Sequence, residues 1–516
     1  MSNLSFISKL YRGRNCYSDH MTKEELDRIH ISSGVEKTIV ELIKKNKIVF
    51  LTGNPGDGKT FIIKAIEQDI NPFSPYVNYD LNSVRSYNDI VDSIVDCYKN
   101  NKPALLAVNE YPFFVMCRDL KAENKELAQE IDAAKDNIIV YNNKPQRSLG
   151  QVVIIDLNER NMLAQNRDLT AEALDKLCNL LKADNPDNKY LKYNLTSLDE
   201  KEIRTQLIEL INLAAQSCEH FAVRDILGAL SFALTACTTD DYEGLYYFDA
   251  LFEGKNPLLE LIKQYDPIFL TNPELDERLW NGEITEGWIN EAPQEYPNDS
   301  RFDDYSEEAI KCFKSIKRRY YFEHINGCEL LALQPDEVKS SADVFNNLEA
   351  RKKRIKRSII SSLNKLFLPS SSDKNELRIW TTHRYDLSNE PSVAVSSRYV
   401  SENKLDLVIP RTADWLSEME YMPDHLILKP KDFDSPKLLL DVDFIRTLHA
   451  IDNGYPVGLL APKYVQKASM FLQKLSENNE IADDNDEDEI IIASRNQSFK
   501  RSVYLYDDKY SFEEEE

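Results

Sequence analysis

The sequence predicts an α/β fold with a parallel sheet, followed by further helical regions and a C-terminal α+β domain. Three observations lead to this expectation. An apolar run over 47–52 is followed directly by a glycine-rich turn and then by a helical pattern. Strand-like and helical segments alternate up to residue 157, which is typical of a parallel sheet. Helical patterns then predominate until strand-like runs return beyond residue 376.

Size and charge limit what kind of protein this is. The chain has 516 residues, of which 42% are hydrophobic, enough to bury sizeable cores. Lys and Arg number 63, Asp and Glu number 87, and the net charge is −24. Such an acidic surface restricts nucleic-acid contact to a local basic patch. Since we find no Cys-x-x-Cys pair, signal peptide or membrane-length apolar run, we expect a soluble cytoplasmic protein.

The glycine-rich turn is the most specific motif of the chain. It reads Gly-Asn-Pro-Gly-Asp-Gly-Lys-Thr and fits the P-loop pattern G-x-x-x-x-G-K-[ST] between a strand and a helix. Glycines let the backbone point successive N–H groups at one anion, and the helix N-terminus adds its dipole. The motif predicts ATP and Mg²⁺ as cofactors, with Lys59 at the phosphates and Thr60 at the metal. The expected nucleotide-binding residues are Gly53, Asn54, Pro55, Gly56, Asp57, Gly58, Lys59, Thr60 and Phe61.

Periodicity predicts the elements that follow the turn. The expected helices are 61–68, 88–100 and 112–135, and the expected strands are 76–80, 104–109 and 151–157. A P-loop needs an acidic partner on a neighbouring strand, and two of these strands end in polar residues. One ends in Asn109 and Glu110, and the other in Asp156 and Asn158.

Glu110 is a candidate for the carboxylate that acts as general base or positions the attacking water, and its choice over Asp156 is what the resemblance given next implies. Asn109 can orient metal-bound water by hydrogen bonding, but it adds no negative charge. Asp156 therefore stays open as the alternative partner of Mg²⁺.

The order of these segments resembles that of AAA+ ATPases. The resemblance implies that the strand over 104–109 carries the Walker B site. It also implies that Asn158 is sensor 1, a polar residue that contacts the γ-phosphate or the attacking water. A helical lid after the core is a further implication, and it fits the amphipathic stretches over 197–216 and 220–234.

Two kinds of arginine are candidates for phosphate contact. Arg224 lies near the start of the second lid helix, where sensor 2 is expected, and a surface pair with Asp225 or Glu219 is the alternative. Arg160 and Arg167 follow the strand over 151–157 and are candidates for trans arginine fingers in an oligomer.

A narrower resemblance rests on four segments. They are the P-loop, the strand ending Asn-Glu, the strand ending Asp-Leu-Asn-Glu-Arg and the lid sequence Val-Arg-Asp-Ile-Leu. Together they are similar to the ATPase component of DNA-phosphorothioation-dependent restriction and related anti-phage systems, with looser likenesses at 317–323 and 443–455. The resemblance implies an ATPase subunit that acts on DNA with nuclease or helicase partners, and it implies that Asn109 is a family feature.

Composition divides the rest of the chain. A Pro-rich polar stretch over 291–305 and a Ser-rich stretch over 369–375 are typical of linkers. The domains that we expect are an ATPase core over 1–195, a helical lid over 196–290, a basic helical region over 291–370 and an α+β domain over 371–516.

Two predicted helices, over 306–322 and 343–367, are basic within this acidic chain. They indicate a docking face for DNA phosphates or an acidic partner, and a solvated helix face is the alternative. The basic residues are Lys311, Lys314, Lys317, Arg318 and Arg319 in the first helix and Arg351, Lys352, Lys353, Arg354, Lys356 and Arg357 in the second.

Three functions follow from these features. The first is an ATP-hydrolysing regulator or motor of a defence complex. The second is a nucleotide-dependent switch that turns over slowly, because Asn109 replaces a carboxylate. The third is an ATP-dependent nuclease subunit, for which Asp386, Glu402 and Lys404 supply a D…E-x-K pattern that chance explains better.

Overall fold

The protein divides into two compact units. The computed structural model describes residues 2–12, 20–81, 87–141, 148–161, 169–215, 222–302, 305–330, 344–345, 348–369, 371, 373–380, 393–455, 462–485, 489–494, 500–506 and 509–514. Unit 1 comprises Met1–Val140, Lys144–Leu333 and Thr412–Met422, and unit 2 comprises Tyr141–Asn143, Gln334–Arg411 and Pro423–Glu516. A short segment from the C-terminal half of the sequence is therefore part of unit 1.

A four-stranded parallel sheet forms the first half of unit 1, which confirms the predicted α/β core. Its strand order is β2-β3-β1-β5, and every pair in it is parallel. The strands are β1 (Ile48–Thr52), β2 (Tyr76–Asn78), β3 (Ala104–Ala107) and β5 (Val152–Asp156). β1 and β3 are buried along their whole length, as expected for apolar strands covered by helices on both faces.

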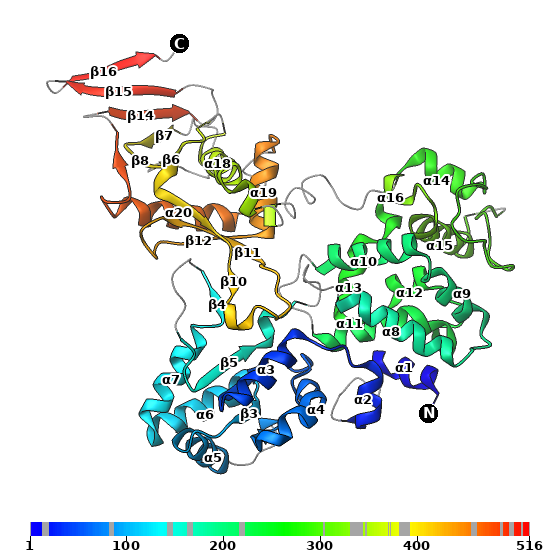
Figure 1. Cartoon of the computed structure of the whole chain (residues 1–516). Coiled ribbons are helices and arrows are strands. Elements are labelled where there is room, and N and C mark those ends of the chain that lie inside the picture. The colour runs from blue at the N-terminus through cyan, green and yellow to red at the C-terminus, as the bar shows by residue number, and fades with distance from the viewer. Residues whose placement is uncertain are drawn as a thin grey trace. The chain divides into compact units, whose positions relative to one another are not determined.

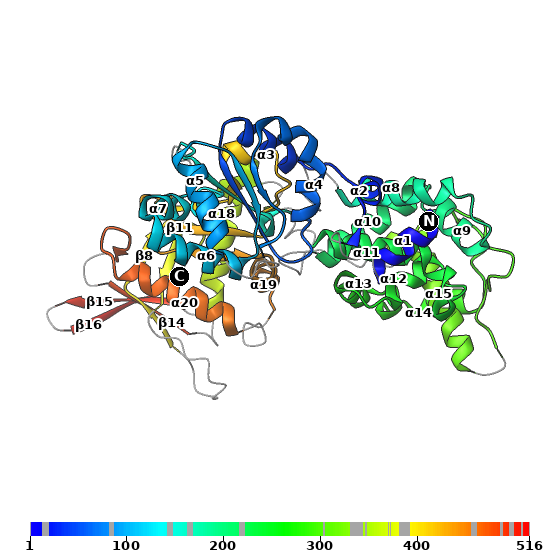
Figure 2. The same ribbon diagram turned by 90° about the horizontal axis from the view of Figure 1, so that it is seen from below.

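Helices cover both faces of this sheet. The helices are α3 (Gly34–Lys44), α4 (Lys59–Ile70), α5 (Asn88–Lys99), α6 (Glu110–Glu123) and α7 (Lys125–Lys135). Figure 2 shows α3 and α4 on one side and α5, α6 and α7 on the other. The predicted helix over 112–135 is two helices, because Asn124 ends α6 and its side chain caps α7 by accepting the Leu127 N–H.

The strand order brings both polar strand ends next to the glycine-rich turn. β1 pairs with β3 on one side, Leu51 opposite Ala107, and with β5 on the other, Thr52 opposite Asp156. Because parallel strands end at the same edge of a sheet, the residues that follow all three strands meet there. Adjacency to β1 alone therefore does not decide between Asn109 and Asp156 as the metal partner.

A helical bundle with its own apolar core forms the rest of unit 1. Its helices are α8 (Leu169–Ala183), α9 (Lys189–Ser197), α10 (Lys201–Ala215), α11 (Val223–Thr235), α12 (Tyr247–Glu253), α13 (Pro257–Ile262), α14 (Pro273–Trp280), α15 (Glu307–Glu323) and α16 (Gly327–Leu330). The N-terminal helices α1 (Asn3–Tyr11) and α2 (Lys23–Ile29) add apolar side chains to the same core, and α1 packs against α8 and α11 (Figures 1 and 2). The boundaries expected at residues 195 and 290 fall inside this bundle, because α8 and α15 share one core.

The basic helix α15 lies inside the bundle, which corrects the docking face expected at Lys311–Arg319. Lys317, Arg318 and Arg319 are only 1%, 6% and 2% exposed. Their ion-pair partners are Asp276 for Lys317, Asp249 and Asp266 for Arg318, and Glu323 for Arg319. These carboxylates come mostly from distant parts of the sequence. A local sequence pattern therefore could not indicate that these basic residues of α15 are buried in ion pairs. Lys311 and Lys314 remain exposed.

Unit 2 has an α+β arrangement, as expected for the C-terminal region. Its antiparallel sheets have the orders β12-β11-β9, β13-β8-β6 and β16-β15-β14-β7. The strands are β6 (Glu376–Ile379), β7 (Val393–Ser396), β8 (Arg398–Ser401), β9 (Leu405–Val408), β11 (His425–Pro430), β12 (Leu438–Asp441), β13 (Asp483–Asp484), β14 (Glu489–Ser494), β15 (Lys500–Tyr506) and β16 (Lys509–Glu514). The helices α18 (Leu348–Phe367), α19 (Val442–Asp452) and α20 (Pro462–Ser476) share one apolar core. Two further strands are β4 (Ile139–Val140) and β10 (Arg411–Thr412).

The second basic helix, α18, is partly neutralised by its own unit. Lys352 pairs with Asp406, and Lys356 and Arg357 both pair with Glu402. The cations that stay exposed are Arg351, Lys353 and Arg354. The expected docking face on α18 is therefore smaller than the sequence indicates.

Two residues of the D…E-x-K pattern, Glu402 and Lys404, are held in ion pairs within unit 2. Glu402 is buried, and the cations of Lys356 and Arg357 lower the pKa of its carboxyl against the effect of burial. Lys404 pairs with Asp483 instead of extending the pattern. Asp386 lies outside the described residues. Within the described part of the chain, no helix is both long and apolar enough to cross a membrane.

Candidate functional site

The turn between β1 and α4 has the backbone that its glycines predict. Gly53, Gly56 and Gly58 have φ angles of 143°, 104° and 88°, a region that side chains disfavour and glycine adopts readily. The Lys59 ammonium donates hydrogen bonds to the carbonyl oxygens of Gly53, at 2.7 Å, and Asn54, at 2.8 Å. The side chain of Lys59, the first residue of α4, is therefore folded back onto the preceding glycine-rich turn.

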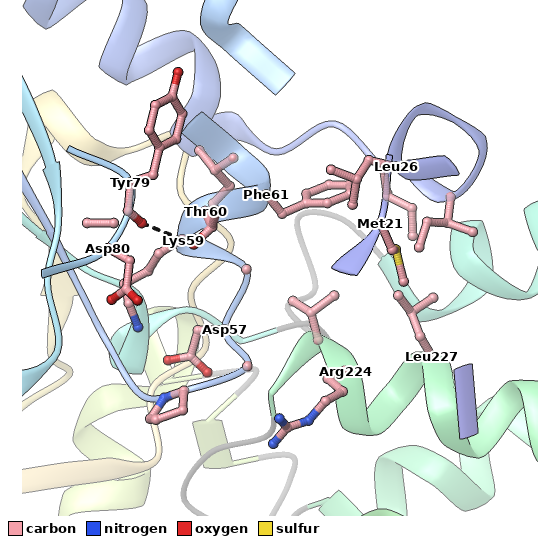
Figure 3. A pocket seen from close by; sticks show the side chains of 18 of the residues that line it. Met21, Leu26, Asp57, Lys59, Thr60, Phe61, Tyr79, Asp80, Arg224 and Leu227 are labelled. Carbon is pink, nitrogen blue, oxygen red and sulfur yellow. Dashed lines mark hydrogen bonds between the residues drawn. The ribbon is translucent and has the colours of Figure 1, made fainter. Parts of the chain in front are cut away.

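A cavity of about 230 Å³ opens at this turn (Figure 3). Figure 3 shows one end lined by polar side chains, among them Asp57, Thr60 and Asp80, while Phe61 and Leu227 belong to the apolar end. Most of the other apolar side chains of the lining come from the N-terminal segment and from α11, and they include Leu10, Met21, Leu26, Ile29, Ile31 and Val223. A cavity that is polar at one end and apolar at the other suits a ligand with a charged tail and an apolar ring.

Lys59 is buried at the polar end of the cavity. Burial lowers the pKa of its ammonium, while the carboxylates of Asp57, Asp156 and Asp80 act in the opposite direction. Desolvation of the ammonium disfavours its charged form. A negatively charged ligand at this point would offset that effect, since it would stabilise the charged lysine.

Oxygen donors suited to Mg²⁺ lie at the same end of the cavity. Thr60, Asp80 and Asn109 line it, and the Thr60 hydroxyl donates to the Tyr79 carbonyl oxygen at 3.2 Å (Figure 3). Of the two open candidates Asn109 and Asp156, only Asn109 is among the described lining residues. Asp156 instead accepts the Asn158 N–H at 3.0 Å. The donor set fits Mg²⁺, which is usually bound through one or two carboxylates, waters and substrate phosphates.

Two of the predicted catalytic residues contact each other beside the P-loop. The Asn158 side-chain amide donates to the Glu110 carboxylate at 3.3 Å. The Asn158 side-chain oxygen accepts the backbone N–H of Asn54, in the P-loop, at 3.2 Å. Glu110 is the first residue of α6, and Asn158 lies in the 3₁₀ turn after β5. The structure thus brings together two residues that are far apart in sequence, although neither is among the residues that line the cavity.

Arg224 connects the bundle to the P-loop. A Cβ atom built on Gly56 would lie 3.2 Å from the Cζ and Nη2 atoms of Arg224. The guanidinium therefore packs against the P-loop backbone at Gly56, and Figure 3 shows Arg224 reaching toward the turn from α11. The alternative pair with Asp225 is also present, since Nε of Arg224 lies 3.9 Å from an Asp225 carboxylate oxygen, and Glu219 lies outside the described residues.

Among the charged lining residues, Asp80 and Glu36 were not singled out from the sequence, and Arg160 was singled out only for a role in trans. Asp80 follows β2, Glu36 lies in the first turn of α3 and bonds to His30 at 2.8 Å, and Arg160 follows the 3₁₀ turn. The position of Asp80 at the end of a parallel strand was a usable signal. Arg160 is buried and lines the cavity of its own chain, while its predicted role as an arginine finger in trans stays a prediction. Arg167 lies outside the described residues.

Comparison of the chain with protein-family models, curated proteins and solved structures found no match. The function is therefore argued from the residues of the site.

Proposed function

We propose that the chain is a P-loop ATPase that binds MgATP in the cavity at the β1–α4 turn. The observation that carries the proposal is the turn itself. Three glycines at positive φ shape the turn. Two of them, Gly56 and Gly58, line the cavity together with the buried Lys59, oxygen donors for a metal and a second cation, Arg224. Phosphates are recognised in this way, by backbone N–H groups, a helix N-terminus and a lysine.

Each residue has a distinct task in this proposal. The P-loop N–H groups, Lys59 and Arg224 bind the phosphate tail and neutralise charge that develops on it. Mg²⁺, when bound by Thr60, Asn109 and Asp80, neutralises further phosphate charge. Glu110 takes the proton of the attacking water, and Asn158 holds the carboxylate beside the P-loop.

Phosphate release in the steady state tests the hydrolytic part of the proposal. We expect Glu110→Gln to retain ATP binding and to lower the release rate by about a hundredfold or more, since general-base catalysis contributes 10²–10⁴-fold. Glu123→Gln, an exposed change at the other end of α6, is the matched control and should leave the rate unchanged. Equal rates for wild type and Glu110→Gln would remove Glu110 from the mechanism.

A slow nucleotide-dependent switch is the second candidate, and the cavity position of Asn109 favours it. An amide oxygen binds Mg²⁺ more weakly than a carboxylate because it carries no net charge. We expect Asn109→Asp to lower the Mg²⁺ concentration needed for half-maximal phosphate release. If the change leaves both the metal requirement and the rate unaltered, the missing charge does not limit turnover.

We further propose, on the sequence resemblance, that the ATPase is a regulator or motor subunit of a bacterial anti-phage complex. ATP-dependent movement of α11, whose Arg224 packs on the P-loop, is a means by which such a subunit changes the arrangement of the bundle. Co-purification from the native host should recover nuclease or helicase subunits. Recovery of the chain alone, with and without ATP, would contradict this role.

The exposed part of α18 is the remaining candidate for DNA contact. Arg351 and Arg354 line a second cavity of about 210 Å³ together with His449, Ser358 and Ser362. If phosphates bind there, Arg351→Glu with Arg354→Glu should weaken DNA binding and reduce its salt dependence. Lys311→Glu with Lys314→Glu on α15 is the charge-matched control, and an equal loss in both variants would contradict a specific site.

A further inference from the structure

Glu420 is a buried carboxylate that joins three separate parts of unit 1. It is 1% exposed and belongs to Thr412–Met422, the segment that follows β9 and β10 in sequence. It accepts hydrogen bonds from the Ser33 hydroxyl at 2.7 Å, the Gly34 N–H at 3.0 Å and Nε of Arg160 at 3.1 Å. Its backbone carbonyl also accepts the Asn161 N–H at 2.8 Å. A carboxylate buried this deeply is retained only where such partners compensate its desolvation.

Arg160 is the partner that reaches the cavity. It is 8% exposed and lines the cavity beside the P-loop. Its bond to Glu420 uses Nε, and within the described part of the chain its two terminal nitrogens donate no hydrogen bond. A guanidinium has five N–H donors, so four remain for another partner. The natural partner of a buried guanidinium with free terminal donors is a phosphate or carboxylate oxygen.

The contacts of Glu420 leave much of the Arg160 charge available. Ser33 is the N-cap of α3 and Gly34 its first residue, so the Glu420 carboxylate also faces the positive end of a helix dipole. The negative charge is shared between a hydroxyl, a helix N-terminus and Nε. Arg160 is thereby held in place without being fully neutralised.

We propose that Arg160 contacts the phosphate tail of the nucleotide in its own chain, and that Glu420 is the positioning residue that holds it there. The proposal rests on the proposed nucleotide binding and extends it. It assigns the site a third phosphate-binding cation besides Lys59 and Arg224. Nucleotide binding then depends on the segment Thr412–Met422, which carries Glu420. The strands on either side of this segment in the sequence, β9 and β11, pair with each other in unit 2.

Titration of the full-length protein with ATP, ADP, AMP and adenosine tests the proposal. We expect Arg160→Ala to lower the affinity for ATP by about tenfold to a hundredfold, as for the loss of a charge-assisted hydrogen bond. The affinity for adenosine should change little, and Arg160→Lys should recover part of the loss. A loss of the same size for adenosine and ATP would overturn the phosphate contact.

A double-mutant cycle separates positioning from general stability. Glu420→Gln should weaken ATP binding by about threefold or more in the wild-type background and not at all in the Arg160→Ala background, because coupled residues are not additive. Glu323→Gln, which removes another buried carboxylate bonded to an arginine, is the matched control and should leave the ratio of ATP to adenosine affinity unchanged. Additive losses from Arg160→Ala and Glu420→Gln would overturn the positioning role.

The same titrations distinguish this inference from the proposed function. If wild type binds no ATP, the proposed function fails and this inference fails with it. If wild type binds ATP and Lys59→Ala abolishes binding while Arg160→Ala binds like wild type, only the inference about Arg160 and Glu420 is wrong. Melting curves without nucleotide show that each variant is folded before it is titrated.

Discussion

At the scale of single residues, Gly56 combines a backbone conformation that favours glycine with a position in the candidate site. Its φ of 104° disfavours any side chain, and an added Cβ would press on the Arg224 guanidinium. We expect Gly56→Ala to weaken ATP binding by about tenfold, since the left-handed region costs about 1–2 kcal/mol for other residues. ATP titration measures the change.

Gly454→Ala is a suitable control for Gly56→Ala. Gly454 in unit 2 has a φ of 87°, and nothing lies within 4 Å of a Cβ built on it. This variant should lose stability without losing ATP affinity. If both variants bind ATP like wild type, the contact between Arg224 and the P-loop does not support binding.

His324 gives the bundle a dependence on pH. Burial lowers the pKa of its ring, and the Asn326 N–H donates to Nδ1 at 3.1 Å, which requires that nitrogen to be unprotonated. Nε2 bonds to the Glu286 carbonyl oxygen. A histidine whose folded pKa lies below its unfolded value contributes stability above the unfolded pKa, near 6.5, and loses it as the pH falls through the folded pKa.

Denaturant unfolding at pH 7.5 and at pH 5 tests this dependence. We expect wild type to lose stability at the lower pH, and His324→Gln to lose less. The same pH dependence in both proteins would mean that other groups control it.

The site residues differ in how far the sequence reveals them. Lys59 and Thr60 belong to a motif with fixed spacing, and Glu110 and Asn158 follow apolar strands, so pattern and topology were enough to nominate them. Arg160 was nominated only as an arginine finger in trans, because its place in the cavity wall depends on a bond to Glu420, 260 positions later in the chain. No local pattern contains a contact of that range.

At the scale of elements, the buried basic residues of α15 hold the helical bundle together through ion pairs. Arg318 makes hydrogen bonds to Asp266 and Asp249, and its guanidinium lies over the Phe252 ring. We expect Arg318→Met to destabilise unit 1 by about 3–5 kcal/mol, because two buried carboxylates lose their partner. Denaturant unfolding checks this against Lys311→Met, an exposed change on the same helix with little expected effect. Similar losses of unfolding free energy in the two variants would mean that Arg318 does not stabilise unit 1 through buried ion pairs.

The elements were predicted well where the pattern is local. Alternating apolar strands and amphipathic helices gave the parallel sheet. Short apolar runs beyond residue 376 indicated part of the strands of unit 2, but β8, β12, β13 and β16 were not predicted. The N-terminal helices were not predicted, although Thr22 and Glu25 form a capping box at the start of α2. The break at Asn124 was also missed, since the residues on both sides continue a helical pattern.

At the scale of the whole molecule, the segment Thr412–Met422 makes the core of unit 1 depend on the C-terminal half of the sequence. Leu416 and Met419 are buried in the core of the parallel sheet, and the Trp415 indole donates to the Asn137 carbonyl oxygen. We expect Leu416→Ala to destabilise unit 1 by about 2–5 kcal/mol, as for other buried leucines.

Leu439→Ala removes the same side chain from an exposed position on β12 and serves as the control. Unfolding followed by a probe in unit 1 compares the two variants. Equal stability would mean that the segment is dispensable for this core. The sequence could not predict this insertion, because a short segment without periodicity says nothing about which core it joins.

ATP titration of wild type and Lys59→Ala tests the central claim most directly. We expect saturable binding to wild type and a loss of affinity of about a hundredfold or more in Lys59→Ala, with Lys64→Ala on the same helix unaffected. Absence of saturable binding to wild type, or equal affinity in wild type and Lys59→Ala, would contradict the account.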